Sequence, residues 1–68
     1  MKVKYFLDTD TALIEFTHIA VHETKEISEN IYVELDKDGN LVSMTIEYAK
    51  ANAGSWEFSY QEIASRAA

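Results

Sequence analysis

The chain has 68 residues, with six Lys and Arg against twelve Asp and Glu, which gives a net charge of −6. A chain of this length buries only about 60% of its unfolded surface, so we expect one small domain over 1–68 with a thin core and no enclosed cofactor cavity. The acidic balance argues against nucleic acids and anionic membranes, because both require clustered cations and only Lys2 and Lys4 lie close together. It favours association with a basic protein partner.

Cysteine is absent, which excludes disulfides, a thiol nucleophile and cysteine-ligated metals. Small secreted domains usually depend on disulfides, so the composition favours the reducing cytoplasm. No apolar run approaches the ~20 residues that span a bilayer. The apolar stretch after Lys2 and Lys4 is also too short for a signal peptide. We therefore expect a soluble cytoplasmic protein.

The first half of the chain shows alternating patterns of uneven strength. Apolar residues alternate over 3–7, which predicts a first strand, and 8–11 has the composition of a turn. The stretch 12–18 predicts a second strand with one apolar face. Between 19 and 30 the signal weakens, and 20–27 fits a short exposed strand, which we favour, or a polar loop.

The clearest local signal lies in the middle of the chain. Two alternating runs, 31–36 and 42–48, flank Asp38-Gly39. Glycine accepts the positive φ that tight hairpin turns require, so this segment predicts a β-hairpin.

The last part of the chain predicts a connection and a helix. Small residues over 49–55 indicate a connection that can hold one helical turn. Ser59 to Glu62 fits a capping box, and an apolar stripe continues to Ala67, which predicts a short helix that must dock on the sheet or on a partner. The predicted fold class is α+β: a small antiparallel sheet of four or five strands in meander order, followed by a short C-terminal helix.

Two groups of residues superficially suggest metal binding. Asp36 to Asn40 resembles part of a calcium loop, but with Gly39 at the sixth position Thr45 falls where the motif needs a bidentate Glu. A hairpin turn accounts for these residues better. His18 and His22 lack the second histidine of a His-Glu-x-x-His motif, and on one strand they would lie ~13 Å apart, so they fit surface histidines.

Carboxylate pairs are the remaining candidates for chemistry. Asp8 with Asp10, and Glu34 with Asp36, lie at predicted turns or solvent-facing ends, where carboxylates stay ionised. General acid–base catalysis needs one carboxylate with a raised pKa. The sequence therefore assigns no catalytic residue, no cofactor and no metal ligand.

Three aromatic residues near the predicted helix, Trp56, Phe58 and Tyr60, have two interpretations. They can seal the helix onto the sheet, or they can anchor a protein interface, where large aromatic residues are enriched. The two interpretations overlap, because a chain this small can complete its core by dimerising.

Two stretches carry a resemblance to a known family. Asp10-Thr11-Ala12-Leu13-Ile14 resembles an early Asp-x-Ala-Leu-Tyr-Ile segment, and 31–47 resembles a strand–Asp-x-Asp-Gly–strand hairpin. Both are features of the YuzE-like domain-of-unknown-function family 2283 of small prokaryotic proteins, and 58–63 is similar to a tail of some members. Thr45 stands where members often have Glu. The resemblance implies a small α+β fold and no established activity. Because some members are encoded beside toxins, it also implies an antitoxin-like role.

Two hypotheses of function follow from the sequence. The first is a non-enzymatic protein-interaction domain, a small acidic homodimer that masks a basic partner and uses its edge strands and the Trp56–Tyr60 region. The second is a small-ligand-binding or enzymatic module whose site forms at a dimer interface.

Overall fold

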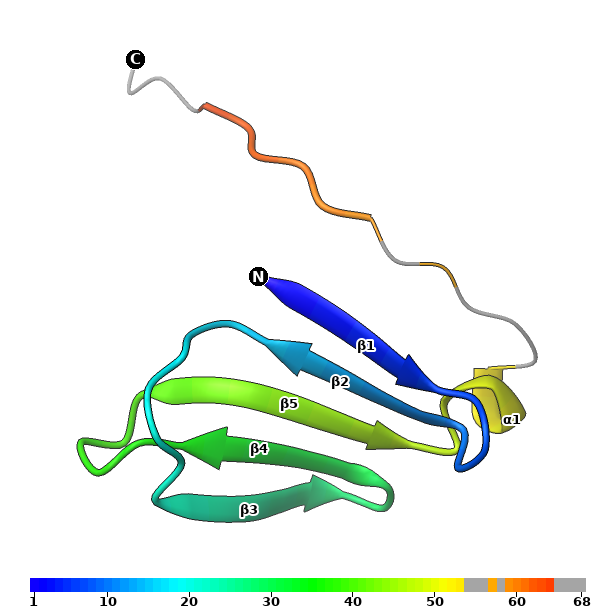
Figure 1. Cartoon of the computed structure of the whole chain (residues 1–68), viewed down its shortest axis with the longest axis horizontal. Coiled ribbons are helices and arrows are strands. Elements are labelled where there is room, and N and C mark those ends of the chain that lie inside the picture. Colours follow the sequence, from blue (N-terminus) through cyan, green and yellow to red (C-terminus); the bar gives the residue numbers. More distant parts are fainter. Residues whose placement is uncertain (54–56, 58, 65–68) are drawn as a thin grey trace.

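The structure is a computed structural model that describes residues 1–53, 57 and 59–64 (Figure 1). Within these ranges, alternating residues build five strands, and one short helix follows them. The elements are β1 (Lys2–Phe6), β2 (Thr11–Glu15), β3 (Glu23–Ser28), β4 (Ile31–Leu35), β5 (Leu41–Glu47) and α1 (Ala49–Ala53). No helix in these ranges is long and apolar enough to cross a membrane.

All strand pairs are antiparallel and form one sheet in the order β1-β2-β5-β4-β3 (Figure 1). The ambiguous stretch is thus a fifth strand, β3. The predicted meander is correct for β1–β2 and for β3–β4–β5, but wrong between β2 and β3, because β2 pairs with β5. Strand burial gives the reason: every residue of β3 is exposed, whereas Ala12 in β2 and Val42 in β5 are buried. The strands with buried residues lie side by side, and β3 forms an edge.

The predicted hairpin is confirmed. Val33 pairs with Met44 and Glu34 with Ser43 across β4 and β5, and Gly39 in the connecting turn has a φ of 84°. A residue with a Cβ is strained at this φ, so the turn requires glycine or a residue that tolerates the left-handed region.

The predicted C-terminal helix is wrong over the described part of its range. The helix within the described residues is α1, in the segment predicted as a connection with one helical turn. Residues 57 and 59–64 form no helix and are exposed, with Tyr60 63% and Ile63 75% accessible. A helix this short needs a docking surface, and nothing buries 59–64. The end of its stripe, Ala67, lies outside the described residues. The fold is therefore mostly β.

The register gives the sheet two different faces. On one face, Val3, Ile14, Met44 and Val33 form a row across β1, β2, β5 and β4. A second row on this face consists of Tyr5, Ala12, Ile46 and Ile31. We call these eight residues the apolar face.

The opposite face carries most of the charged strand residues. Its rows are Lys2–Glu15–Ser43–Glu34–Thr24 and Lys4–Leu13–Thr45–Tyr32–Glu26, in register across all five strands. We call these ten residues the polar face. Side chains alternate between the faces because the strand repeat is two residues, so the sequence pattern separates the two chemistries.

The core is thin. Among the described residues, the buried apolar side chains are Ala12, Val42 and Ala49, and no large side chain is fully buried. The described residues thus form a single-layer sheet, whereas stable domains usually pack at least two layers around a core.

Candidate interaction surfaces

The apolar face has no covering layer in the described part of the chain. Seven of its eight residues are only half-buried, and Ala12 is the exception with 1% exposure. The helix α1 lies at one end of the sheet, beside the turn between β1 and β2 (Figure 1). The described residues after α1 are exposed and run away from the sheet (Figure 1). Among the described residues, this face therefore has no second layer packed against it.

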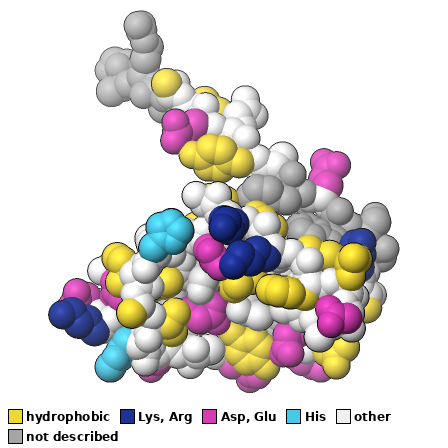
Figure 2. All heavy atoms as spheres, in the orientation of Figure 1, with side chains coloured by type: hydrophobic (Ala, Val, Ile, Leu, Met, Phe, Trp, Pro, Cys, Tyr) yellow, Lys and Arg dark blue, Asp and Glu magenta, His cyan; other side chains and the backbone are white. Residues whose placement is uncertain are grey.

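Hydrogen bonds and one ion pair organise the polar face. Lys4 Nζ lies 3.1 Å from Glu15 Oε1. Glu34 Oε1 accepts hydrogen bonds from Ser43 Oγ at 2.8 Å and from Thr45 Oγ1 at 3.1 Å. In Figure 2, Lys side chains gather beside an acidic one over the start of β1, and other acidic side chains lie across the sheet. The polar groups of this face stabilise one another across strands.

Charge is distributed unevenly over the polar face. Both of its lysines lie on β1, at one edge of the sheet. Towards the other edge lie Glu34 and Glu26, and Glu47 follows on β5. A hydrogen bond to Glu47 and its negative charge are the main causes that raise the pKa of Tyr32. The β3–β4–β5 half of this face is therefore acidic.

Asp10 connects the first hairpin to α1. Its Oδ1 accepts hydrogen bonds from Tyr5 Oη at 2.5 Å and from the Lys50 N–H at 2.9 Å, and its Oδ2 accepts one from the Ala51 N–H at 3.0 Å. The Asp10 carbonyl also accepts a bond from the Ala49 N–H at 2.9 Å. Asp10 has a φ of 55°, which Asp tolerates better than most residues. The carboxylate thus caps a helix distant in sequence.

These contacts shift two pKa values. The hydrogen bond from Tyr5, followed by the Lys50 and Ala51 amides, lowers the pKa of Asp10. The same hydrogen bond raises the pKa of Tyr5 to about 12. Lys50 Nζ lies 4.7 Å from the centroid of the Tyr5 ring, within cation–π range. A carboxylate with a lowered pKa and three donors is a structural group and a poor general base.

Asp36 organises the hairpin turn in a similar way. Asp36 is buried, with 6% exposure. Its Oδ1 accepts hydrogen bonds from the backbone N–H groups of Asp38 and Asn40, both at 2.9 Å. The hydrogen bond from the Asn40 backbone N–H is the main cause that lowers the pKa of Asp36. The turn thus accounts for Asp36, in place of a calcium loop. Within the described ranges, no group of three or more His, Asp or Glu could hold a metal ion.

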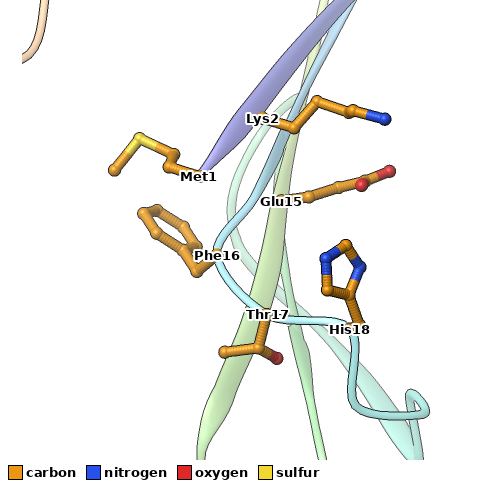
Figure 3. Close-up of a pocket in the computed structure, with 6 residues that line it drawn as sticks. All are labelled: Met1, Lys2, Glu15, Phe16, Thr17 and His18. Atoms are coloured by element: carbon orange, nitrogen blue, oxygen red, sulfur yellow. The ribbon is translucent and has the colours of Figure 1, made fainter.

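The structure does not bring the two histidines together. Both lie in the loop 16–22 between β2 and β3, not on one strand. His18 lines a pocket of about 200 Å³ in which Lys2, Glu15 and His18 point to one side and Met1 and Phe16 to the other (Figure 3). His22 lines a different pocket of about 450 Å³, together with Ile19, Ala20, Val21, Asp36, Lys37 and Asp38.

Of the three aromatic residues predicted to bind a partner, Tyr60 is described, and Trp56 and Phe58 lie outside the described residues. Tyr60 does not pack on the sheet. Its hydroxyl donates a hydrogen bond to Glu62 Oε1 at 2.8 Å, which is the main cause that raises the pKa of Tyr60.

Sequence reasoning missed the partners of Asp10 and Glu34. The sequence predicts a turn at Asp10. No local pattern links this residue to a helix 40 positions later in the chain. For Glu34, the sequence indicates a strand position and a candidate acid–base pair with Asp36, but no hydroxyl partners on another strand. In the structure Glu34 and Asp36 have different partners. Glu34 accepts hydrogen bonds from hydroxyl groups of β5, and Asp36 accepts them from backbone N–H groups of the turn.

Together these features define a small, mostly β domain built on one five-stranded antiparallel sheet with a terminal helical turn. The chain belongs to DUF2283, a family of proteins of unknown function, whose pattern matches residues 2–50. No curated protein and no solved structure matches the chain. The matched segment contains all five strands and ends at Lys50, the residue whose amide Asp10 binds.

Proposed function

We propose that this chain is a non-enzymatic protein-interaction domain, a cytoplasmic homodimer that binds and masks a basic protein partner as an antitoxin does. The observation that supports the proposal is the apolar face, on which no described part of the chain forms a second layer. A single-layer sheet leaves apolar surface in water, and each Å² that association would bury contributes about 25 cal/mol. Association is therefore the most direct way for this fold to complete its core.

The polar face supports the choice of a basic partner. Glu26, Glu34 and Glu47 lie on the β3–β4–β5 half, and both lysines of this face lie on β1 at the opposite edge. The acidic half attracts a positively charged protein surface and raises the rate at which the two proteins associate. The net charge of −6 acts in the same direction.

The titratable groups give less support to an enzyme. The shifted carboxylates, Asp10 and Asp36, have lowered pKa values and hold backbone amides, and the pKa of Tyr5 is raised to about 12. At neutral pH all three keep their ordinary protonation states, whereas acid–base catalysis uses groups that titrate near the working pH. A ligand site at the dimer interface is the alternative that the experiment below distinguishes.

The test is purification of the native complex at low salt, followed by identification of what binds and in what ratio. We expect a basic protein at a fixed stoichiometry that salt releases. The double variant Glu26→Gln, Glu47→Gln on the acidic half should weaken this binding, whereas Glu29→Gln, in the exposed β3–β4 turn, should not. A bound metabolite and no protein would overturn the proposal in favour of the ligand-binding alternative.

A further inference from the structure

We infer that two copies of this chain pack apolar face against apolar face, so that two five-stranded sheets form a sandwich around a shared core. The inference rests on the proposed homodimer and specifies its interface. Val3, Ile14, Met44 and Val33 would form the central row of this interface in each copy. Sheets that pack in this way lie about 10 Å apart with interdigitating side chains.

Charge selects this face for contact between copies. Each copy carries a net charge of −6, so two copies repel each other wherever their acidic surfaces meet. The eight residues of the apolar face include no ionisable group except the Tyr5 hydroxyl, which is bonded to Asp10. At its border, β3 places Glu23 opposite Leu35 and Lys25 opposite Val33. An apolar centre with a polar rim of both signs is the usual anatomy of a protein interface.

The chain exposes more surface than a compact monomer of its size. The chain exposes 5504 Å², whereas a compact monomer of 7.7 kDa exposes roughly 4,300 Å². Some of the excess of roughly 1,200 Å² belongs to the exposed residues 57 and 59–64. The sheet contributes as well, because the large side chains of the apolar face are only half-buried.

A second copy fits the face better than the described residues after α1 do. Residues 57 and 59–64 run clear of the sheet in Figure 1, and Tyr60 and Ile63 are mostly exposed. The rows of the apolar face match a second sheet, because an isologous contact brings identical apolar patches together. Each copy would thus bury its apolar face against the same face of the other copy.

The test compares two lysine substitutions on adjacent residues of β5. Met44→Lys places a charge in the centre of the apolar face, whereas Thr45→Lys adds the same charge on the polar face, near Glu34. We expect light scattering to show a dimer for the native chain and for Thr45→Lys. The dissociation constant of Met44→Lys should rise at least tenfold, with the β-sheet circular dichroism signal retained.

A second measurement needs no variant and decides the question if Met44→Lys fails to fold. In a mixed sample of labelled and unlabelled native chains, isotope-filtered NMR should show contacts from the Met44 methyl group of one copy to Ile14 or Val33 of the other. A dimer that survives Met44→Lys without such contacts would overturn this packing and leave the homodimer standing. A native monomer at micromolar concentration would overturn both, and contacts from Met44 to 59–64 within one chain would identify the chain's own end as the cover.

Discussion

The carboxylate of Asp10 accepts a hydrogen bond from the backbone N–H of Lys50, 40 positions later in the chain, at 2.9 Å. A second bond joins Asp10 to the Ala51 amide, so one side chain satisfies two N–H groups that the first turn of α1 cannot pair internally. The turn between β1 and β2 thereby positions the only helix in the described residues. This contact fixes where the chain leaves the sheet.

Replacing Asp10 should release α1. Asp10→Ala removes the acceptors for Lys50, Ala51 and Tyr5, and in a domain this small we expect the melting temperature to fall by about 5 °C or more. The Lys50 and Ala51 amide NMR signals should also lose their protection from hydrogen exchange. Thermal unfolding of Asp8→Ala is the control, because Asp8 is exposed in the same turn. Equal melting temperatures for the two variants would contradict the capping role.

The Tyr5–Asp10 hydrogen bond predicts a loss of stability at alkaline pH. The pKa of Tyr5 is raised from 10.0 to about 12, so its contribution is fully present below pH 10 and is lost as the pH rises towards 12. The Tyr5 ring carbon signal should titrate with a midpoint near 12 in NMR. In Asp10→Ala, which removes the hydrogen-bond acceptor of Tyr5, the midpoint should move back towards 10. A midpoint of 10 in the native chain would refute the contact.

Asp36 predicts the opposite dependence, at acid pH. Because its pKa is lowered from 3.8, its contribution is present above pH 3.8 and is lost as the pH falls further. Asp36→Ala should therefore be less stable than the native chain at neutral pH, and the difference should shrink in acid. Denaturant unfolding at pH 7 and pH 2 measures this. A difference that stays constant with pH would show that the charge of Asp36 does not hold the turn.

The turn at Gly39 predicts a graded response to substitution. Nothing lies within 4 Å of a Cβ placed there, so any cost of substitution comes from the φ of 84° and not from collision. Gly39→Val should destabilise the chain by about 1–2 kcal/mol, whereas Gly39→Asn should cost less because Asn tolerates the left-handed region. Chemical denaturation compares the two. If Gly39→Val were as stable as the native chain, the turn would have a different conformation.

Much of the fold was predictable, because alternation and turn residues are local signals. The hairpin of β4 and β5 followed from two alternating runs around Gly39, and its turn has the expected positive φ. The placement of β3 did not follow, because β2 pairs with β5 across a long separation that no local pattern encodes. The sequence predicts the helix too late in the chain, because the apolar stripe over 59–67 is a local pattern. The cap of α1 comes from Asp10, which is distant in sequence and leaves no local pattern.

The sequence by itself determined that this is a small acidic chain of alternating strands with an asymmetric sheet, because the two-residue repeat of a strand sorts side chains onto two faces. Only the tertiary structure decided which strands lie next to each other, that Asp10 holds α1, and that the apolar face has no covering layer among the described residues. Strand order and uncovered surface depend on contacts between distant segments, and those contacts exist only once the chain has folded.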